Sequence, residues 1–432
     1  MRVLVIGSGG REHALVWALK RTSARPLQLF CAPGNAGIAE IAQCVAIAVT
    51  DVNALADCAE RERIDLTMVG PESSLAEGVV DEFQRRGLRI VGPSMDAARL
   101  ETSKAFAKDF MQRHSIPTAR FRVATSVAEA QDVLTSGEFG DERAPLVVKA
   151  DGLAAGKGVV VAQSRDEASQ AIGEITNLGA PAQRIVIEEA LFGREASVLL
   201  FSDGKDFRLM PPARDHKRIG DGDTGPNTGG MGAVTDSHVI DDAILRRVVA
   251  EIVEPTLQGA RAEGFPFRGV LFIGLMLTAG GPKVLEYNVR FGDPETQAIL
   301  VRLQTDLTEI LEAIVDERLG DVEVEWSDES SACVVLAARG YPAKPETGAR
   351  IHGLRPDGQH ADAVVLHAAT TRGANGEWLT AGGRVLGITS TAETLEAALS
   401  RCYAAVADIH WEGMHYRRDI GRTPTPTAAA TG

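Results

Sequence analysis

The sequence predicts a multidomain protein that combines α/β and α+β architecture. The first observation is length, because 432 residues exceed a single domain of ordinary size. The second is the alternation of short apolar runs with amphipathic stretches over residues 1–101, which is typical of a parallel sheet covered by helices. The third is a set of three strand patterns followed by one long helix pattern after residue 331, which predicts a small α+β unit.

Composition limits the classes of partner. The net charge of −14 repels polyanions and anionic lipid, so we expect neither nucleic acid nor membrane partners. The five cysteines are scattered and form no C-x-x-C pair, which argues against a disulfide framework or a zinc site and favours a cytoplasmic location. The start MRVLVIG has a strand pattern rather than that of a signal peptide, and no apolar run reaches the roughly 18 residues of a membrane span.

The N-terminal region predicts a parallel sheet. Its strand patterns lie at 3–6, 27–31, 66–69 and 89–91, and its helix patterns at 12–20, 53–61 and from GPESS to residue 86. Three strand ends carry polar or glycine-rich turns, namely GSGGRE (7–12), APGNAG (32–37) and GPESS (70–74). Open α/β sheets bind ligands at the carboxyl ends of their strands, so these turns predict a ligand crevice.

The turn GSGGRE is not a dinucleotide-binding fingerprint. Glu12 stands where G-x-G-x-x-G requires its third glycine, and a carboxylate there repels a pyrophosphate. Gly7, Gly9 and Gly10 still suit one phosphate held by backbone N–H groups at a helix start, although a plain strand-to-helix turn has the same pattern. Glu72 suits either ribose hydroxyl groups or a helix N-terminus.

The central region begins with a single predicted helix over residues 100–120, stopped by a proline. Residues 146–162 (LVVKADGLAAGKGVVVA) then predict a hairpin with a glycine-rich tip. Its spacing is not that of a P-loop, but its backbone N–H groups suit phosphates. Lys149 lies inside an apolar strand pattern, where a lysine is costly unless it is paired or binds an anion. Lys157 has the alternative role of a solvated tip residue.

Two polar stretches follow. Residues 184–201 predict two strands around a bend with Glu188, Leu191 and Glu195, although acidic residues also mark strand ends for structural reasons. Residues 211–234 (PPARDHKRIGDGDTGPNTGGMGAV) lack apolar periodicity and predict a long loop, a feature that is usually functional in a compact domain. An amphipathic helix is predicted at 240–262.

The stretch VLEYNVRFGDPETQ (284–297) carries the strongest chemical signal. It follows the apolar strand pattern 269–277 and predicts a second strand with two different faces. Glu286, Asn288 and Arg290 share one face, and Leu285, Tyr287 and Val289 share the other. Two oxygen ligands beside a fixed cation suit Mg²⁺ bound together with phosphates, whereas a solvated polar face is the alternative. A helix is predicted at 297–318.

The C-terminal region predicts strands at 332–338, 363–370 and 384–389 and a helix at 391–410. It has few polar clusters, so we expect it to serve as structural cover. The tail at 421–432 is of low complexity, and we expect it to be disordered.

Taken together, these motifs resemble the glycinamide ribonucleotide synthetase (phosphoribosylamine–glycine ligase) family of the ATP-grasp superfamily. The resemblance rests on GSGGREHAL, APGNAG, VGPE, VVKADGLAAGKGV, TGPNTGGMGA and VLEYNVRFGDPETQ, and it covers residues 1 to about 420. It implies that ATP, glycine and 5-phosphoribosylamine give ADP, phosphate and glycinamide ribonucleotide through glycyl phosphate. It also implies a domain order of 1–101 (phosphoribosylamine-binding), 102–325 (ATP-grasp, with a lid at about 122–192) and 328–420.

The resemblance assigns roles residue by residue. Mg²⁺ (or Mn²⁺) is expected on Glu286 and Asn288, with Arg290, Lys217 and Asp215 as the catalytic group around the γ-phosphate and glycine. The expected ATP contacts are Lys104, Lys149, Gly156, Lys157, Gly158, Glu188, Glu189, Leu191 and Glu195. The expected substrate contacts are Gly9, Gly10, Asn35 and Glu72 for phosphoribosylamine, and Asp293 and Thr296 for glycine. All partners are small molecules, apart from a transient contact with the enzyme that makes phosphoribosylamine.

Two positions depart from the family pattern, and several alternatives stay open. Gly274 stands where many ATP-grasp enzymes have an acidic metal ligand, and Ser8 stands where many relatives have Asn. Another ATP-grasp carboxylate–amine ligase would share Lys149, Glu286 and Asn288 but not TGPNTGGMG. A nicotinamide-dependent oxidoreductase and a non-catalytic nucleotide-binding module are the alternatives from other classes.

Overall fold

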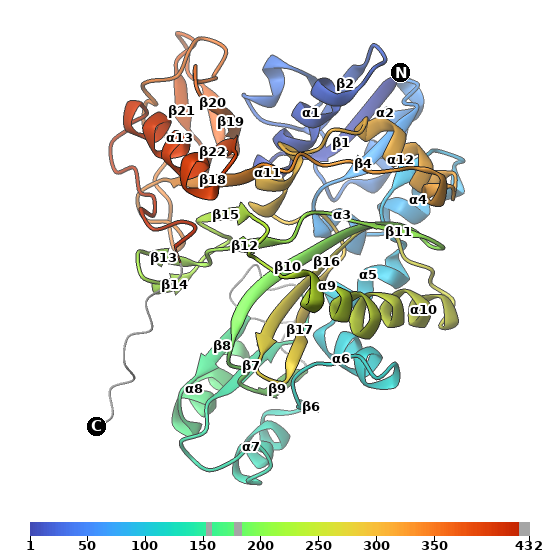
Figure 1. Cartoon of the computed structure of the whole chain (residues 1–432), viewed down its shortest axis with the longest axis vertical. Helices are drawn as coiled ribbons and strands as arrows, with labels where there is room; N and C mark the ends of the chain where they lie inside the picture. The colour runs from blue at the N-terminus through green and yellow to red at the C-terminus, as the bar shows by residue number, and fades with distance from the viewer. Residues whose placement is uncertain (153–157, 177–183, 423–432) are drawn as a thin grey trace.

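The computed structural model describes residues 1–152, 158–176 and 184–422. Its N-terminal part is the predicted parallel sheet, drawn in blue in Figure 1. The strands, in spatial order, are β3 (Gln43–Cys44), β2 (Gln28–Pro33), β1 (Arg2–Gly7), β4 (Leu66–Val69) and β5 (Ile90–Val91). The helices are α1 (Gly10–Thr22), α2 (Val52–Arg61), α3 (Glu72–Ala76) and α4 (Val79–Arg85). The single helix predicted up to residue 86 is therefore wrong, because Gly78 divides it.

A nine-stranded sheet forms the centre of the molecule (Figure 1). In spatial order its strands are β17 (Gly281–Asn288), β16 (Arg268–Thr278), β10 (Arg194–Asp203), β12 (Ala213–Asp215), β15 (Gly232–Thr235), β18 (Ser330–Ala337), β22 (Arg384–Ala392) and β19 (Val364–His367), and β11 (Phe207–Leu209) pairs with β10. The C-terminal strands β18, β22 and β19 continue this sheet through the antiparallel pairing of β15 with β18. The C-terminal region is thus joined to the central region by backbone hydrogen bonds.

The predicted long loop at 211–234 is wrong in one respect, because it contains short strands. Besides β12 and β15, it holds the hairpin of β13 (Arg218–Gly220) and β14 (Thr224–Asn227). Each strand has only three or four residues, too few for a periodic apolar pattern. The C-terminal region likewise contains a hairpin, β20 (Thr370–Arg372) and β21 (Trp378–Thr380), that the sequence did not indicate, next to the predicted helix α13 (Leu395–Asp408).

A separate four-stranded sheet lies below the central sheet in Figure 1. Its order is β6 (Phe121–Ala124), β9 (Ile185–Glu189), β7 (Leu146–Ala150) and β8 (Val159–Ala162), and it packs with α7 (Val127–Thr135) and α8 (Arg165–Thr176) around its own apolar core. The hairpin predicted at 146–162 is confirmed in β7 and β8. Gly156 and Lys157 of its tip lie outside the described residues, as does 423–432 of the tail.

Two predicted helices are each divided in the structure. The helix expected at 100–120 consists of α5 (Met95–Thr102) and α6 (Lys104–Arg113), because Ser103 adopts an extended backbone and accepts a hydrogen bond from the N–H of Phe106. The helix expected at 297–318 consists of α11 (Glu295–Leu300) and α12 (Leu307–Val315). In contrast, α9 (Asp242–Val248) and α10 (Glu254–Ala262) are joined by a π-helical turn, as the prediction for 240–262 requires. Among the described residues, no helix has both the length and the apolar character needed to span a membrane.

Polar contacts of Asn35 and His13 help to hold the N-terminal and C-terminal regions together, alongside an ion pair between Arg372 and Glu40. The Nδ2 group of Asn35 donates to the carbonyl oxygens of Ser8 (2.8 Å) and His367 (2.9 Å), and its Oδ1 accepts from the N–H groups of Gly37 and Ile38. The N–H of His367 donates to Nδ1 of buried His13 at 2.7 Å.

The contacts of Asn35 predict a stability effect. We expect Asn35→Ala to lower the free energy of unfolding by about 2–4 kcal/mol, because it leaves several partly buried backbone groups without their partner. The exposed Asn375 is the matched control, and Asn375→Ala should change stability by less than about 0.5 kcal/mol. Urea unfolding measures both, and equal midpoints for the two variants would show that the Asn35 contacts contribute nothing.

The buried histidines predict acid sensitivity. Burial lowers the pKa of His13 to about 3 and that of His367 to about 4, so both are neutral in the folded protein at pH 7. The unfolded chain binds protons at these sites near pH 6.5, and stability is therefore lost as the pH falls from 7 to 5, by about 2 kcal/mol per histidine. His13→Asn should reduce the slope of unfolding free energy against pH, and a slope equal to that of the wild type would contradict this prediction.

Candidate active site

Two adjoining cavities contain most of the predicted site residues. The inner cavity, of about 450 Å³, lies between β17, α6 and the start of α3. The outer cavity, of about 640 Å³, lies between the sheet of β7 and β9 and the strands β10 and β12. Both are lined by Lys149, Val159, Glu188, Asp215, Lys217, Leu285 and Glu286. They therefore form one continuous site that an elongated ligand can fill.

The polar row of β17 faces the inner cavity. Glu286, Asn288 and Arg290 all line it, and Nη2 of Arg290 donates to Oδ1 of Asn288, as expected for side chains on one face. Leu285 was predicted on the opposite face, but a β-bulge opposite Gly274 and Leu275 places it at the cavity, while Val284 and Tyr287 enter the core.

Glu286 is held in its ionised form by surrounding lysines. Burial opposes its ionisation, but the charges of Lys217, Lys149 and Lys104 outweigh burial and lower the pKa of Glu286. An ionised carboxylate beside the Oδ1 of Asn288 fits a divalent cation of the Mg²⁺ type that completes its shell with phosphate oxygens and water. Gly274 lies opposite Glu286 and supplies no third ligand. Among the described residues, no group of three His, Cys, Asp or Glu side chains forms a metal cluster by itself.

Glu188 ties two lysines together under the site. Its carboxylate lies 2.9 Å from Nζ of Lys149 and 2.9 Å from Nζ of Lys108, and all three side chains are buried. Burial lowers the pKa of Lys108 to about 8, although Glu188 opposes the shift. Lys149 also donates to the carbonyl oxygen of Leu285 (3.2 Å), which fixes it beside Glu286. Lys108 was missed by the sequence analysis, because a lysine in an amphipathic helix carries no signal.

A second charge cluster follows β12. Nζ of Lys217 lies 3.0 Å from Oε2 of Glu195. Burial lowers the pKa of Lys217, but the charges of Asp215, Glu195 and Glu286 outweigh burial and raise it above its usual value. Burial raises the pKa of Asp215, and burial together with Asp215 raises the pKa of Glu295 to about 8. Glu295 also lines the inner cavity. It was not predicted as a site residue, although it lies only two residues after the expected residue Asp293.

The glycine-rich segment after β14 packs directly on the GDPE turn. Thr228 donates through its N–H and its hydroxyl to the carbonyl oxygen of Lys217, both at 2.8 Å. Gly230 has φ +112° and lies so close to Pro294 that a Cβ atom would overlap the proline ring. Only glycine fits this position without strain, so the close packing of this segment on the GDPE turn depends on Gly230.

Arg290 is held by carboxylates from two other elements. Its Nη2 lies 2.8 Å from Oε1 of Glu101 at the end of α5, and its Nε lies 3.2 Å from Oε2 of Glu72 at the start of α3. Nη2 also donates to Oδ1 of Asn288 at 3.2 Å. Burial opposes ionisation of the guanidinium, but Glu101 and Glu72 raise the pKa of Arg290, so it keeps its charge.

The C-terminal region contributes more than the predicted structural cover. Arg384 of β22 donates to the carbonyl oxygens of Gly229 (2.5 Å) and Asp293 (2.7 Å), and its Nη2 lies 3.0 Å from Oδ2 of Asp293. Gln297 donates to the other carboxylate oxygen of Asp293 at 2.7 Å. A C-terminal arginine thus sets the position of an expected glycine contact, which the sequence did not indicate.

The hairpin of β7 and β8 is anchored at the start of α6. Lys104, the first residue of α6, lines the inner cavity and donates to the carbonyl oxygen of Gly152 at 2.8 Å. Asp151 accepts from the hydroxyl of Ser103 (3.0 Å) and from the N–H of Ala105 (3.1 Å). Gly158 lines the inner cavity from the other end of the hairpin.

The remaining predicted residues divide into two groups. Glu189, Leu191 and Glu195 line the outer cavity, and Glu72 and Asp293 line the inner one. Gly9, Gly10, Asn35 and Thr296 line neither cavity. The N–H of Gly9 donates to Oε2 of Glu12 (2.5 Å), and the buried hydroxyl of Thr296 donates to the carbonyl oxygen of Gly292 (2.6 Å). Their predicted substrate contacts stay predictions.

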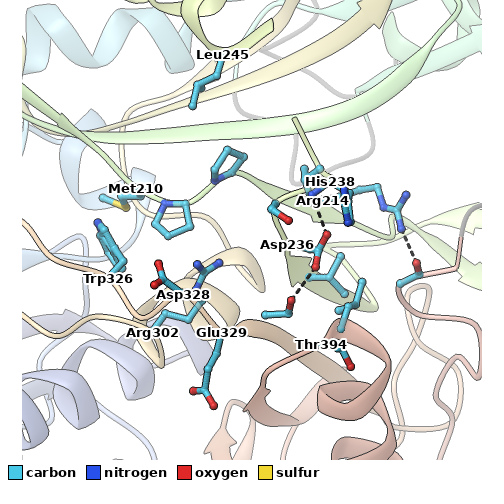
Figure 2. A pocket seen from close by; sticks show the side chains of 18 of the residues that line it. Met210, Arg214, Asp236, His238, Leu245, Arg302, Trp326, Asp328, Glu329 and Thr394 are labelled. Atoms are coloured by element: carbon cyan, nitrogen blue, oxygen red, sulfur yellow. Dashed lines mark hydrogen bonds between the residues drawn. The ribbon is translucent and has the colours of Figure 1, made fainter. Parts of the chain in front are cut away.

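A larger cavity, of about 740 Å³, lies elsewhere, between the central and C-terminal regions (Figure 2). Its three arginines donate to backbone carbonyl oxygens: Arg194 to His238, Arg214 to Gly421 and Arg302 to Ser327. Asp236 accepts from the hydroxyl of Ser330 at 2.7 Å. The contacts of Arg214 and Asp236 join the two regions, and none of the predicted site residues lines this cavity.

The comparisons with known proteins agree along the whole chain. Models of the N, ATP-grasp (A) and C domains of phosphoribosylglycinamide synthetase match residues 1–101, 102–296 and 331–423. The chain is 50% identical over 427 residues to a phosphoribosylamine–glycine ligase of Xanthomonas axonopodis pv. citri (strain 306), covering 98% of this chain and 97% of that protein. It is 48% identical over 429 residues, or 98% of each protein, to the ligase of the same name from Escherichia coli (strain K12). The crystal structure of the Thermotoga maritima ligase has a TM-score of 0.82 and 34% identity, and the match covers 97% of this chain and 100% of that one. The chain belongs to the phosphoribosylglycinamide synthetase family.

Proposed function

We propose that the chain ligates glycine to 5-phosphoribosylamine at the expense of ATP, as the names of its relatives indicate. The observation that carries the proposal is the row of Glu286, Asn288 and Arg290, which shares one cavity with the three lysines that keep Glu286 ionised, Lys104, Lys149 and Lys217. The glycine carboxylate attacks the γ-phosphorus of ATP, the bond to the bridging oxygen breaks, and ADP leaves. The nitrogen of phosphoribosylamine then attacks the acyl carbon of glycyl phosphate, loses a proton and expels phosphate. Such chemistry depends on positioning and charge stabilisation.

The outer cavity is the proposed nucleotide site. Glu189 and Leu191 flank the bend between β9 and β10, where backbone groups suit the adenine edge. Glu195 suits the ribose hydroxyl groups, since its carboxylate faces the same cavity. Lys149 and Lys104 extend from there towards the inner cavity and suit the phosphates. Gly158, together with Gly156 and Lys157, belongs to the proposed lid.

Glu286 and Asn288 are the proposed ligands of Mg²⁺ (or Mn²⁺). A bound cation of this kind would neutralise charge on the β- and γ-phosphates. The two side chains would supply one ionised and one neutral oxygen, and phosphate oxygens and water would complete the shell. Asp215, at the end of β12, and Lys217, just after it, line the same inner cavity, where they suit the γ-phosphate and glycine.

The inner cavity beyond Arg290 is the proposed site of the other substrates. Glu72 suits the hydroxyl groups of phosphoribosylamine, and Asp293 suits the ammonium group of glycine. Gly9 belongs to the same proposal, since a Cβ atom there would lie 3.5 Å from Oδ2 of Asp293. Gly10 follows Gly9 in the same turn, Asn35 adjoins that turn through its hydrogen bond to the carbonyl oxygen of Ser8, and Thr296 acts through Gly292.

Other properties of the chain are part of the proposal. The proposed domains are 1–101, 102–325 with a lid at about 122–192, and 328–420. We also propose a cytoplasmic location, as the scattered cysteines indicate, and a transient contact with the enzyme that makes phosphoribosylamine. The latter is motivated by the instability of that substrate.

The activity predicts a strict dependence on three substrates. We expect ADP release with Mg²⁺, ATP, glycine and freshly made phosphoribosylamine, and we expect background rates when either glycine or phosphoribosylamine is omitted. A coupled assay for ADP measures each combination. ADP release that is unchanged without phosphoribosylamine would refute the proposal and favour another ATP-grasp carboxylate–amine ligase.

Substitution of Glu286 tests the proposed metal site. We expect Glu286→Gln to lower kcat by roughly 10³-fold or more, because charge stabilisation by a metal ion contributes several kcal/mol to the transition state. The chain should stay folded, since the substitution keeps the shape of the side chain, and circular dichroism checks this. The exposed Glu309→Gln on α12 is the control and should keep full activity. A Glu286→Gln enzyme with normal kcat would remove Glu286 from the metal site.

A further inference from the structure

Glu101 is a buried carboxylate that the mechanism above does not use. It lies in the last turn of α5, at the junction between the N-terminal and central regions, and its side chain is 6% exposed. Its two oxygens have different partners: Oε2 accepts from the N–H of Val289 at 2.7 Å, and Oε1 lies 2.8 Å from Nη2 of Arg290. Because one oxygen binds the backbone and the other the guanidinium, the direction of the ion pair is fixed.

Three hydrogen bonds and one ion pair hold the Arg290 guanidinium. Nε donates to Glu72 and Nη1 donates to the carbonyl oxygen of Phe291, both at 3.2 Å, while Nη2 donates to Oδ1 of Asn288 and pairs with Glu101. A guanidinium presents its N–H donors in one plane. Partners on all three nitrogens therefore fix the orientation of that plane in the inner cavity.

The two carboxylates around Arg290 differ in exposure. The side chain of Glu72 is 35% exposed and lines the inner cavity, so a substrate in the cavity can take it over. Glu101 also lines the inner cavity, but only 6% of its side chain is exposed and its Oε2 already accepts from the N–H of Val289, so a substrate reaches it less readily. Glu101 is therefore the more permanent partner of Arg290, and Glu72 is the more exchangeable one.

We infer that Glu101 is a positioning residue, which orients the Arg290 guanidinium towards the transferring phosphoryl group and, through it, the Oδ1 atom of Asn288 towards the metal. This inference rests on the proposed function. Glu101 is not among the proposed substrate contacts or metal ligands, and its effect on the reaction runs through Arg290. Such outer partners fix the orientation of the side chain that contacts the ligand, so their loss changes the reaction without removing a contact to the substrate.

The variant that tests this is Glu101→Gln, which keeps the shape and an oxygen acceptor for Val289 but has no charge. We expect kcat to fall roughly 10–100-fold, as is usual for the loss of an outer-shell partner, while KM for ATP changes by less than about twofold. The matched control is Glu263→Gln, because Glu263 forms an ion pair of similar length with Arg113 (2.8 Å) on the surface, away from both cavities. Its kcat should stay within about twofold of that of the wild type.

A double-mutant cycle separates positioning from a structural role. In an Arg290→Met background no guanidinium is left to orient, so Glu101→Gln should change kcat by less than about twofold. An unchanged kcat of the single variant Glu101→Gln, or an equal loss of kcat with and without Arg290, would overturn the inference. If Glu101→Gln does not fold, Glu101→Asp goes through the same cycle with the same criterion. A wild type without phosphoribosylamine-dependent turnover refutes the proposed function and the inference together, whereas additive losses in an active enzyme refute the inference alone.

Discussion

The charge balance around Glu286 is the constraint on which the site depends. Three lysines keep this buried carboxylate ionised, and they come from three separate elements: Lys104 from the start of α6, Lys149 from β7 and Lys217 from the end of β12. Each lysine would repel the others in a cavity of low dielectric, so acidic partners are needed nearby. Glu188 forms an ion pair with Lys149, and Glu195 forms an ion pair with Lys217. The ionised state of Glu286 therefore depends on the folded positions of three elements: the start of α6, the hairpin of β7 and β8, and the central sheet.

The continuity of the central sheet explains how a C-terminal arginine reaches the site. The strands β18 and β22 extend the sheet beyond β15, and β22 therefore carries Arg384 to the segment 228–230 and the turn at 292–295. Both are loops, and loops need fixed neighbours if they are to hold a substrate in one geometry. The C-terminal region supplies such a neighbour and binds the N-terminal region through His367 at its other edge.

Much of this arrangement could be predicted from the sequence, and the reasons for the failures are physical. Period-two alternation correctly placed Glu286, Asn288 and Arg290 on one face, and the apolar alternation of the first hundred residues correctly indicated a parallel sheet. The bulge at Leu285 could not be predicted, since an extra residue in one strand depends on its pairing with β16. Ser103 divides α5 from α6 because Asp151, distant in sequence, accepts a hydrogen bond from its hydroxyl group. Lys108, Glu101 and Arg384 act through partners distant in the sequence, so no local motif marks them.

The N-terminal turn is fixed by a carboxylate of the protein itself. The carboxylate of Glu12 accepts from the N–H of Gly9, and its other oxygen lies 2.6 Å from Nε of Arg11. Glu12 thus caps the start of α1 from within the helix, as in a capping box. Nη1 of Arg11 lies 3.1 Å from the carbonyl oxygen of Phe291 and 3.9 Å from Oε2 of Glu72, which itself pairs with Arg290. A row of alternating charges therefore runs from the glycine-rich turn to β17. Since Glu72 is the most exposed member of this row, a ligand that engaged Glu72 would alter the surroundings of Arg290 directly.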